Sequence, residues 1–191
     1  MVKKQKAKKD NESFGKWLLQ VLVMAAILLG IYYLISNFVL SNDTVSGPSM
    51  EPTFESGDRL ITTRNSAIKR GKIIVFKAPD EPGALYIKRV IGLPGDTVSS
   101  KNDVTYINGK PIKEPYLNAY KKKLAPNTLY TNNFSLKKLF GVTRVPKGSY
   151  FVMGDHRDVS KDSRMIGFIK KSAIIGRVRW RYYPFNQMKF F

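Results

Sequence analysis

One uncharged segment of 24 residues, from Trp17 to Leu40, constrains the fold of this chain more than any other feature of its sequence. Only Gln20, Ser36 and Asn37 are clearly polar interruptions in it. At a rise of about 1.5 Å per residue, a helix of this length can cross a hydrocarbon core of roughly 30 Å. The apolar region of a cleaved signal peptide is shorter, about 7–15 residues, and ends at a small-residue cleavage site. We therefore expect an uncleaved, single membrane anchor.

The charges on either side of this segment predict its orientation. Residues 1–16 form a basic tail with six lysines and two acids, whereas residues 41–58 contain four acids and no lysine or arginine. Positive charge gathers on the cytoplasmic side of membrane spans. We expect residues 1–16 in the cytoplasm, residues 17–40 in the cytoplasmic membrane, and residues 41–191 outside it as an extracytoplasmic domain.

The composition excludes several classes of site. The chain has no cysteine, which excludes disulfides, thiolate nucleophiles and cysteine-based zinc sites, and its single histidine, His156, excludes a histidine-rich metal site. The formal charge of +19 predicts attraction to anionic headgroups, wall polymers or nucleic acid. We expect no metal, no cofactor and no specific nucleic-acid partner.

Beyond Phe54 the sequence has the pattern of short strands and turns. Runs rich in β-branched and aromatic residues, bounded by glycine or proline, cover residues 59–63, 72–77, 84–93 and 149–153. The pair Asn108-Gly109 between two strand-like pieces is a strong hairpin signal. These features predict a mainly β domain.

Two further stretches of this domain carry much of its positive charge. We expect a smaller inserted region at about residues 97–143, in which the polar, lysine-containing stretch 118–142 forms a mobile flap. That stretch could contact anionic lipid or be only a solvated loop. Over residues 177–182, three arginines alternate with valine, tryptophan and tyrosine, which predicts an inward apolar face and a solvent-facing basic one.

The turn at residues 46–53 presents a candidate nucleophile, Ser49. Gly47, Pro48 and Pro52 restrict or bend the backbone around this serine. A serine on such a rigid turn can point its oxygen towards a substrate, provided that a base elsewhere in the chain activates it. Without a base, the segment is simply a loop that leaves the anchor.

His156 is the only histidine that could serve as this base. Its charged neighbours Asp155, Arg157 and Asp158 are more typical of a surface turn. A lysine is the other candidate, but an ordinary lysine with a pKa of about 10.4 is neutral in fewer than about one molecule in a thousand at pH 7. Burial can lower this pKa by several units.

Lys88 is the lysine in a suitable setting. Strand alternation over residues 84–91 places it on the same face as Tyr86 and Val90, whereas Arg89 lies on the opposite face. The pattern indicates a partly buried amine. An edge strand with both charges extended into water would give the same pattern.

Three motifs, in order behind a single N-terminal anchor, resemble those of the bacterial type I signal peptidases. They are the Ser-Met-x-Pro-Thr motif at residues 49–53 within the turn 46–53, the Tyr-Ile-Lys-Arg strand with its Gly-x-Pro-Gly-Asp exit at 86–96, and the Gly-Asp to Ser-x-Asp-Ser-Arg loop at 154–164. The resemblance covers about residues 17 to 180. It implies a mainly β catalytic domain, a β-barrel or sheet of the signal-peptidase type, with no cofactor.

The resemblance implies that Ser49 is the nucleophile and Lys88 the general base. It implies that Ser160 hydrogen-bonds and orients the lysine amine. It also implies a supporting wall behind the site, made of Asp155, Asp162, Arg164 and, as the partner of Asp155, Arg89.

Two departures from the family pattern affect this site. Gly47 occupies the position where some members carry a serine hydroxyl that helps to bind the oxyanion. The backbone N–H of Ser49 must therefore contribute more, or Ser46 or a water must help, since one lost donor can cost about 3 kcal/mol. His156 and Val159 stand where many relatives have asparagine, so the hydrogen bonding of the loop must differ.

We therefore expect a monomeric, membrane-anchored serine endopeptidase that removes signal peptides from secreted preproteins. The resemblance implies substrates with small residues, often alanine, at the first and third positions before the cut. One alternative is a non-enzymatic anchored module that binds anionic lipid or wall polymer. A self-cleaving repressor-type Ser/Lys peptidase is a weaker alternative, because it would carry a DNA-binding domain where this chain has its anchor.

Overall fold

The computed structural model describes residues 2–34, 39–64 and 66–191, and the chain divides into two compact units, Met1–Leu40 and Ser41–Phe191. The first unit is dominated by helix α1, Val2–Leu34. Within α1, Phe14–Leu34 has a mean hydropathy of 2.1 and is long and apolar enough to cross a membrane. An N-terminal apolar helix is thus present, consistent with membrane anchoring.

The bounds of this helix differ from those of the predicted anchor. The apolar span begins three residues before Trp17, because its mean hydropathy stays high although it includes Lys16 between Gly15 and Trp17. Residues 35–38 of the predicted segment lie outside the described residues. Leu40 belongs to a strand instead, since β1 lies beside β2 in the sheet.

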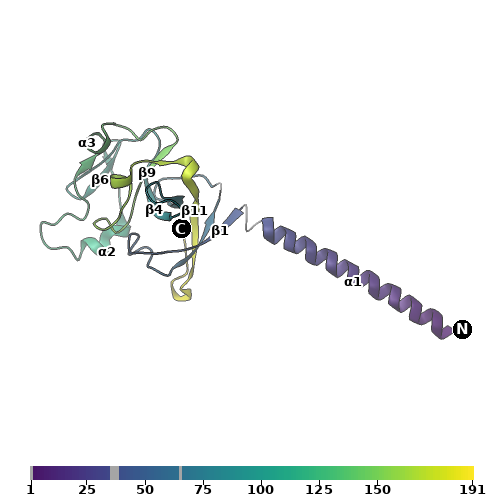
Figure 1. Cartoon of the computed structure of the whole chain (residues 1–191). Coiled ribbons are helices and arrows are strands. Elements are labelled where there is room, and N and C mark those ends of the chain that lie inside the picture. Colours follow the sequence, from purple (N-terminus) through teal and green to yellow (C-terminus); the bar gives the residue numbers. More distant parts are fainter. Residues whose placement is uncertain (1, 35–38, 65) are drawn as a thin grey trace. The chain divides into compact units, whose positions relative to one another are not determined.

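The second unit is built on an eight-stranded sheet in the order β1-β2-β11-β3-β4-β9-β10, with β12 paired to β11. Figure 1 labels β1, β4, β9 and β11 of this sheet. Neighbouring strands from β2 to β10 run antiparallel. The strands are β1 Leu40–Thr44, β2 Arg59–Thr63, β3 Ile73–Lys77, β4 Leu85–Gly92, β9 Ser149–Met153, β10 Ile169–Lys170, β11 Ile174–Tyr183 and β12 Lys189–Phe190.

A smaller sheet in the order β7-β6-β5-β8 lies in the chain between β4 and β9. Asn108 and Gly109 join β6 to β7 with φ angles of 50° and 75°, as the hairpin signal in the sequence predicts. The strands are β5 Val98–Lys101, β6 Val104–Ile107, β7 Lys110–Pro111 and β8 Phe134–Ser135. The short helices are η2 Pro115–Leu117, α2 Asn118–Lys121, α3 Leu136–Phe140, α4 Ser163–Ile166, η3 Lys171–Ala173 and η4 Phe185–Gln187.

Strands β3 and β9 of the large sheet are buried on both faces, which explains their nearly continuous apolar sequences. On β3, Ile73 and Val75 face one core cluster, whereas Ile74 and Phe76 face another. A third cluster joins the two sheets, because Phe151 of β9 packs with Val98 of β5 and its neighbours. The mainly β fold class predicted from the sequence is confirmed.

The arginine stripe of β11 departs from its predicted arrangement. Arg179 is exposed, but Arg177 and Arg181 are buried, with 9% and 7% of their surfaces accessible. The pairing of β11 with β2 shifts register twice, between Val178 and Trp180 and again beyond Arg181, so strict alternation fails. The prediction of a continuous solvent-facing basic stripe was therefore wrong.

Burial of Arg181 depends on one carboxylate. Its Nη1 lies 2.8 Å from Oδ2 of Asp58, which is itself 3% exposed, and also donates to the carbonyl of Thr53 at 3.1 Å. Arg181 thereby links β11 to the turn that carries Ser49. Removing one member of a buried ion pair leaves the other charge without compensation.

We predict that Asp58→Ala destabilises the full-length protein by about 3–5 kcal/mol, because Arg181 then remains buried without its partner. Chemical denaturation in detergent, followed by circular dichroism, measures this loss. Asp80→Ala is the control, since Asp80 pairs with Lys161 at the surface, and we expect it to leave the unfolding midpoint unchanged. Equal midpoints for Asp58→Ala and Asp80→Ala would contradict the prediction.

Candidate active site

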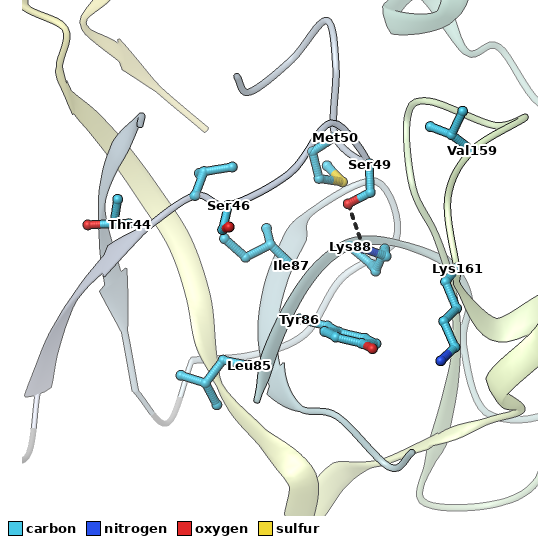
Figure 2. Close-up of a pocket in the computed structure, with 11 residues that line it drawn as sticks. Thr44, Ser46, Ser49, Met50, Leu85, Tyr86, Ile87, Lys88, Val159 and Lys161 are labelled. Atoms are coloured by element: carbon cyan, nitrogen blue, oxygen red, sulfur yellow. Dashed lines mark hydrogen bonds between the residues drawn. The ribbon is translucent and has the colours of Figure 1, made fainter. Parts of the chain in front are cut away.

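The turn at residues 46–53, called here the Ser49 turn, is fixed to the core by the residues next to Ser49. Met50 and Phe54 are 1% and 0% exposed and pack in the cluster that contains Leu60 and Val178. The amide of Phe54 also donates to the carbonyl of Met50 at 2.9 Å. Ser49 itself is half-buried and lines a cavity (Figure 2).

Gly47 gives the turn its shape. Its φ is +82°, in the left-handed region that glycine adopts and L side chains rarely do. A serine at this position would be strained in this backbone conformation. The second donor for the oxyanion stays a prediction.

Lys88 comes to the same cavity from β4, one of the central strands. Its side chain is buried, with 4% of the residue exposed, and its Nζ lies 2.8 Å from Oγ of Ser49 and 5.3 Å from the centre of the Tyr86 ring. Figure 2 shows the amine and the hydroxyl pointing towards each other. Sequence alternation placed Lys88 and Tyr86 on one face, and the structure brings them together there.

Burial lowers the pKa of Lys88 from its ordinary 10.5 to about 8, although the carboxylates of Asp162 and Asp155 act in the opposite direction. At pH 7 about one Lys88 side chain in ten is then neutral, against fewer than about one in a thousand for an ordinary lysine. A neutral amine can accept the proton of a serine hydroxyl. Ser49 and Lys88 thus have the geometry of a nucleophile with its base.

The cavity beside these two groups has a volume of about 260 Å³. Its walls come from three segments: the end of β1 with the Ser49 turn, the start of β4, and the loop of residues 154–164. Apolar side chains line much of it, among them Val45, Met50, Leu85, Ile87 and Val159.

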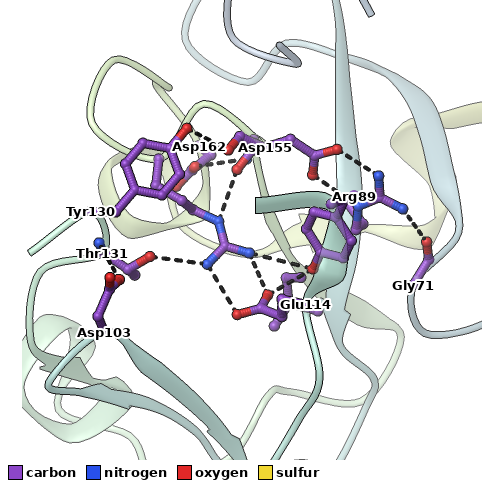
Figure 3. A network of polar contacts seen from close by, with 12 residues as sticks. Gly71, Arg89, Asp103, Glu114, Tyr130, Thr131, Asp155 and Asp162 are labelled. Carbon is purple, nitrogen blue, oxygen red and sulfur yellow. Dashed lines mark hydrogen bonds and ion pairs between the residues drawn. The ribbon is translucent and has the colours of Figure 1, made fainter. Parts of the chain in front are cut away.

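Asp155 stands behind the site and is fully buried. Arg89 donates to it twice, from Nε to Oδ1 at 2.8 Å and from Nη2 to Oδ2 at 2.5 Å, and the hydroxyl of Thr53 donates to Oδ2 at 2.6 Å (Figure 3). Nη1 of Arg89 reaches the carbonyl of Gly71 at 2.7 Å. The carboxylate therefore joins β4, the Ser49 turn and the 154–164 loop.

Asp162 joins the two ends of the 154–164 loop through hydrogen bonds to Gly154 and Arg164. Its Oδ2 accepts from the amide of Gly154 at 2.9 Å, and Arg164 pairs with both carboxylate oxygens at 2.8 Å. Arg164 also donates to the carbonyl of Arg157 at 2.7 Å. Asp155, Asp162, Arg164 and Arg89 thus lie together on the inner side of the site.

Ser160 lies in the same loop and is 5% exposed. Its Oγ has no hydrogen-bond partner in the described part of the chain, and the expected hydrogen bond to Lys88 is not formed there. The hydroxyl packs tightly against Gly154, where an added Cβ would come within 2.1 Å of it. The role of Ser160 in orienting Lys88 stays a prediction.

The contacts of the His156 ring do not suit a role as the base for Ser49. Among the described residues, its ring nitrogens contact the carbonyl of Pro48 at 3.2 Å and the carboxylates of Asp158 and Glu51 at 3.4 and 3.8 Å, rather than the Ser49 hydroxyl. Its backbone amide instead donates to the carbonyl of Ser49 at 3.2 Å. His156 thus braces the Ser49 turn, and Lys88 is the better-placed base.

Sequence reasoning missed several residues that hold the loop in place. Arg157 has a fully buried side chain, paired with Glu114 of the inserted region, and its Nη1 contacts Thr131 at 3.2 Å (Figure 3). Glu114 lies 43 positions from Arg157, so no local pattern predicts the pair. The composition of the loop indicated only a polar surface turn.

Comparison with known proteins places these residues in a family context. The family model described as "Signal peptidase, peptidase S26" matches residues 16–183. Signal peptidase I of Bacillus caldolyticus is 46% identical over 189 residues, covering 95% of this chain and 98% of that protein. Signal peptidase IB of Staphylococcus aureus strain MRSA252 is 38% identical over 183 residues, covering 92% and 94%.

A solved structure agrees with the sequence matches. The crystal structure of a signal peptidase I from Enterococcus faecalis V583 matches with a TM-score of 0.57 at 41% identity, covering 59% of this chain and 97% of that one. These findings confirm the resemblance seen in the three motifs and favour an enzyme over a non-enzymatic binding module. The chain belongs to the signal peptidase family, peptidase S26.

Proposed function

We propose that Ser49 is the nucleophile and Lys88 the general base with which this peptidase cleaves signal peptides from preproteins. One observation carries the assignment: Nζ of Lys88, its pKa lowered to about 8 by burial, lies 2.8 Å from Oγ of Ser49. The pair lies at a cavity partly lined by apolar side chains. Such a cavity can receive the small residues, often alanine, expected at the first and third positions before the cut.

Neutral Lys88 takes the proton of Ser49 as the serine oxygen attacks the carbonyl carbon at the cleavage site. The resulting ammonium returns a proton to the leaving amine, and an acyl-enzyme remains. Lys88, neutral again, then activates the water that hydrolyses the ester. The backbone N–H of Ser49 stabilises the oxyanion, together with Ser46 or a water, because Gly47 offers no hydroxyl.

The residues behind the site act on Lys88 and on the loop. Arg89 and Arg164 compensate the charges of Asp155 and Asp162, which would otherwise favour the ammonium form of Lys88 more strongly. Ser160, with its buried hydroxyl near Gly154, orients the amine when a substrate peptide enters. None of these steps uses a metal or an organic cofactor.

The membrane setting belongs to the same proposal. The basic N-terminal residues lie in the cytoplasm, an anchor within Phe14–Leu34 spans the membrane once, and residues 41–191 act outside it as a monomeric peptidase domain with residues 97–143 inserted. Anchoring confines the enzyme and its membrane-bound substrate to one thin layer. Their effective concentration therefore rises without any additional contact.

Lipid contact is proposed for one surface of the domain, the C-terminal patch formed by Tyr183, Phe185, Met188 and Phe190. These side chains are 44–77% exposed, and Arg59 lies 5.4 Å from the Tyr183 ring. Residues 179–191 contain three basic side chains and no acid, and two of these side chains, Arg179 and Lys189, are exposed. Aromatic rings beside basic groups suit the interface of an anionic bilayer.

We predict that Ser49→Ala and Lys88→Ala each abolish cleavage of a preprotein with alanines before the cut, because each removes one half of the proton transfer. The assay follows cleavage by the full-length protein in detergent or lipid, with circular dichroism to verify folding. Ser56→Ala and Lys77→Ala are matched controls at exposed positions and should cut normally. Cleavage by Lys88→Ala would place the base elsewhere and make His156 the next candidate.

We predict that kcat/KM falls about tenfold for each pH unit below pH 8 and levels off above it. The sign follows from the mechanism: protonated Lys88 cannot act as a base, and its pKa is about 8. Initial rates between pH 5.5 and 10 measure the profile. An acid limb centred near pH 6.5 would instead indicate a histidine and contradict the assignment.

We predict that replacing both Phe185 and Phe190 by serine withdraws the C-terminal patch from the bilayer. Trp180, which stacks on Phe190 at 5.6 Å, serves as the reporter after Trp17→Phe removes the other tryptophan. In anionic vesicles with brominated acyl chains, we expect quenching of Trp180 to fall at least twofold. Met165→Ser, at another exposed apolar position, is the control, and unchanged quenching in the double variant would contradict lipid contact.

A further inference from the structure

Two tyrosines of the inserted region pack against the site. Tyr120 lies on α2 and Tyr130 in the loop that follows, and their rings stack 5.9 Å apart at an angle of 13°. Tyr130 is 2% exposed. The stretch 118–142, for which the sequence suggested a mobile flap, a solvated loop or a lipid contact, is thus partly docked on the catalytic domain.

Tyr120 contacts both of the segments that surround Ser49. Its hydroxyl donates to Oε2 of Glu51 at 2.6 Å, and Glu51 is two residues beyond Ser49 in the same turn. Its ring lies 4.4 Å from the ring of His156 in the 154–164 loop. One side chain therefore bridges the turn of the nucleophile and the loop behind it.

Tyr130 holds the same loop at a neighbouring point. Its hydroxyl donates to the backbone carbonyl of Asp155 at 2.9 Å, and its ring lies 6.5 Å from that of His156. The amide of His156 in turn donates to the carbonyl of Ser49 at 3.2 Å. The position of the 154–164 loop, which Tyr130 contacts, therefore affects the orientation of the Ser49 backbone.

These contacts concern catalysis because the two reacting groups come from different elements. Lys88 lies on β4, whereas Ser49 lies outside the strands, on a turn whose position depends on the contacts of its neighbours. A displacement of about 1 Å between reacting groups can cost up to about 100-fold in rate. Any contact that fixes the Ser49 turn therefore affects the rate of proton transfer.

We propose that Tyr120 is a positioning residue: through Glu51 and His156 it clamps the Ser49 turn onto the 154–164 loop and so sets the approach of Ser49 to Lys88. The inference rests on the proposed roles of Ser49 and Lys88 and gives the inserted region a part in the reaction. Tyr120 does not touch the reacting atoms and acts only through the two residues it holds.

The chemistry of the contact suits this role over the working pH range. The hydrogen bond to Glu51, together with burial, raises the pKa of Tyr120 to about 12, so the phenol remains a donor wherever Lys88 can act as a base. A hydrogen bond to a carboxylate is roughly twice as strong as one between neutral groups. The carboxylate of Glu51 thus gives the clamp a strong acceptor.

The first test removes only the hydroxyl. We expect Tyr120→Phe to lower kcat for preprotein cleavage about tenfold, while KM stays within about twofold, because the turn is displaced but the substrate cavity keeps its walls. Tyr120→Ala, which also loses the ring contact with His156, should fall further. Tyr106→Phe, on β6 of the same inserted region, is the matched control and should cut normally.

A double-mutant cycle separates positioning from a general structural role. If Tyr120 acts through Glu51, Tyr120→Phe should have little additional effect in a Glu51→Ala background, and the two losses should not add. The acid limb of the pH profile should stay near pH 8 in Tyr120→Phe, because the burial of Lys88 is unchanged. Thermal unfolding of each variant measures any loss of stability separately.

Several outcomes would overturn the inference. An unchanged kcat in Tyr120→Phe would show that the hydrogen bond does not position Ser49. A raised KM with normal kcat would make Tyr120 a substrate contact, and additive losses in the cycle would rule out action through Glu51. Failure of the proposed function is recognised independently, since Ser49→Ala or Lys88→Ala would then still cut.

Discussion

The burial of one amine, that of Lys88 against the hydroxyl of Ser49, is the constraint on which the rest of the structure depends. A lysine in water is too rarely neutral to serve as a base at pH 7. The central position of β4 removes Lys88 from water and lowers its pKa to about 8. The Ser49 turn, anchored by Met50 in the core, then brings a hydroxyl to within 2.8 Å of that amine.

Lowering this pKa requires that nearby negative charge be compensated. Asp155 and Asp162 are both fully buried and both favour the protonated lysine. Each carboxylate is engaged by an arginine, Arg89 for the first and Arg164 for the second, and by further hydrogen bonds. The carboxylates can therefore organise the loop while burial still dominates the titration of Lys88.

The sequence predicted the features that depend on local pattern. Strand β2 matches its predicted bounds of residues 59–63, the Asn108-Gly109 turn closes a hairpin, and alternation along β4 placed Lys88 beside Tyr86. Prediction from the sequence failed where the contacting residues lie far apart in the chain, and where a register shift between two strands changes which side chains are buried. The pairing of Arg157 with Glu114, the contact of Tyr120 with Glu51 and the burial of Arg181 leave no periodic signal.

The same burial that favours a neutral Lys88 amine works against the folded state. Its pKa is about 8 when folded and about 10.5 when exposed, so between these pH values the unfolded chain keeps a proton that the folded protein has lost, and below pH 8 the folded state bears the full cost of a buried ammonium. The difference amounts to on the order of 3 kcal/mol at neutral pH and disappears as the pH rises from 8 to 10.5. The fold must offset this cost, and it does so around the site with paired arginines, the buried Met50 and Phe54, and the tyrosines of the inserted region. Tyr120 and Tyr130 contact the Ser49 turn and the 154–164 loop, so the inserted region contributes to this balance on the side of Ser49.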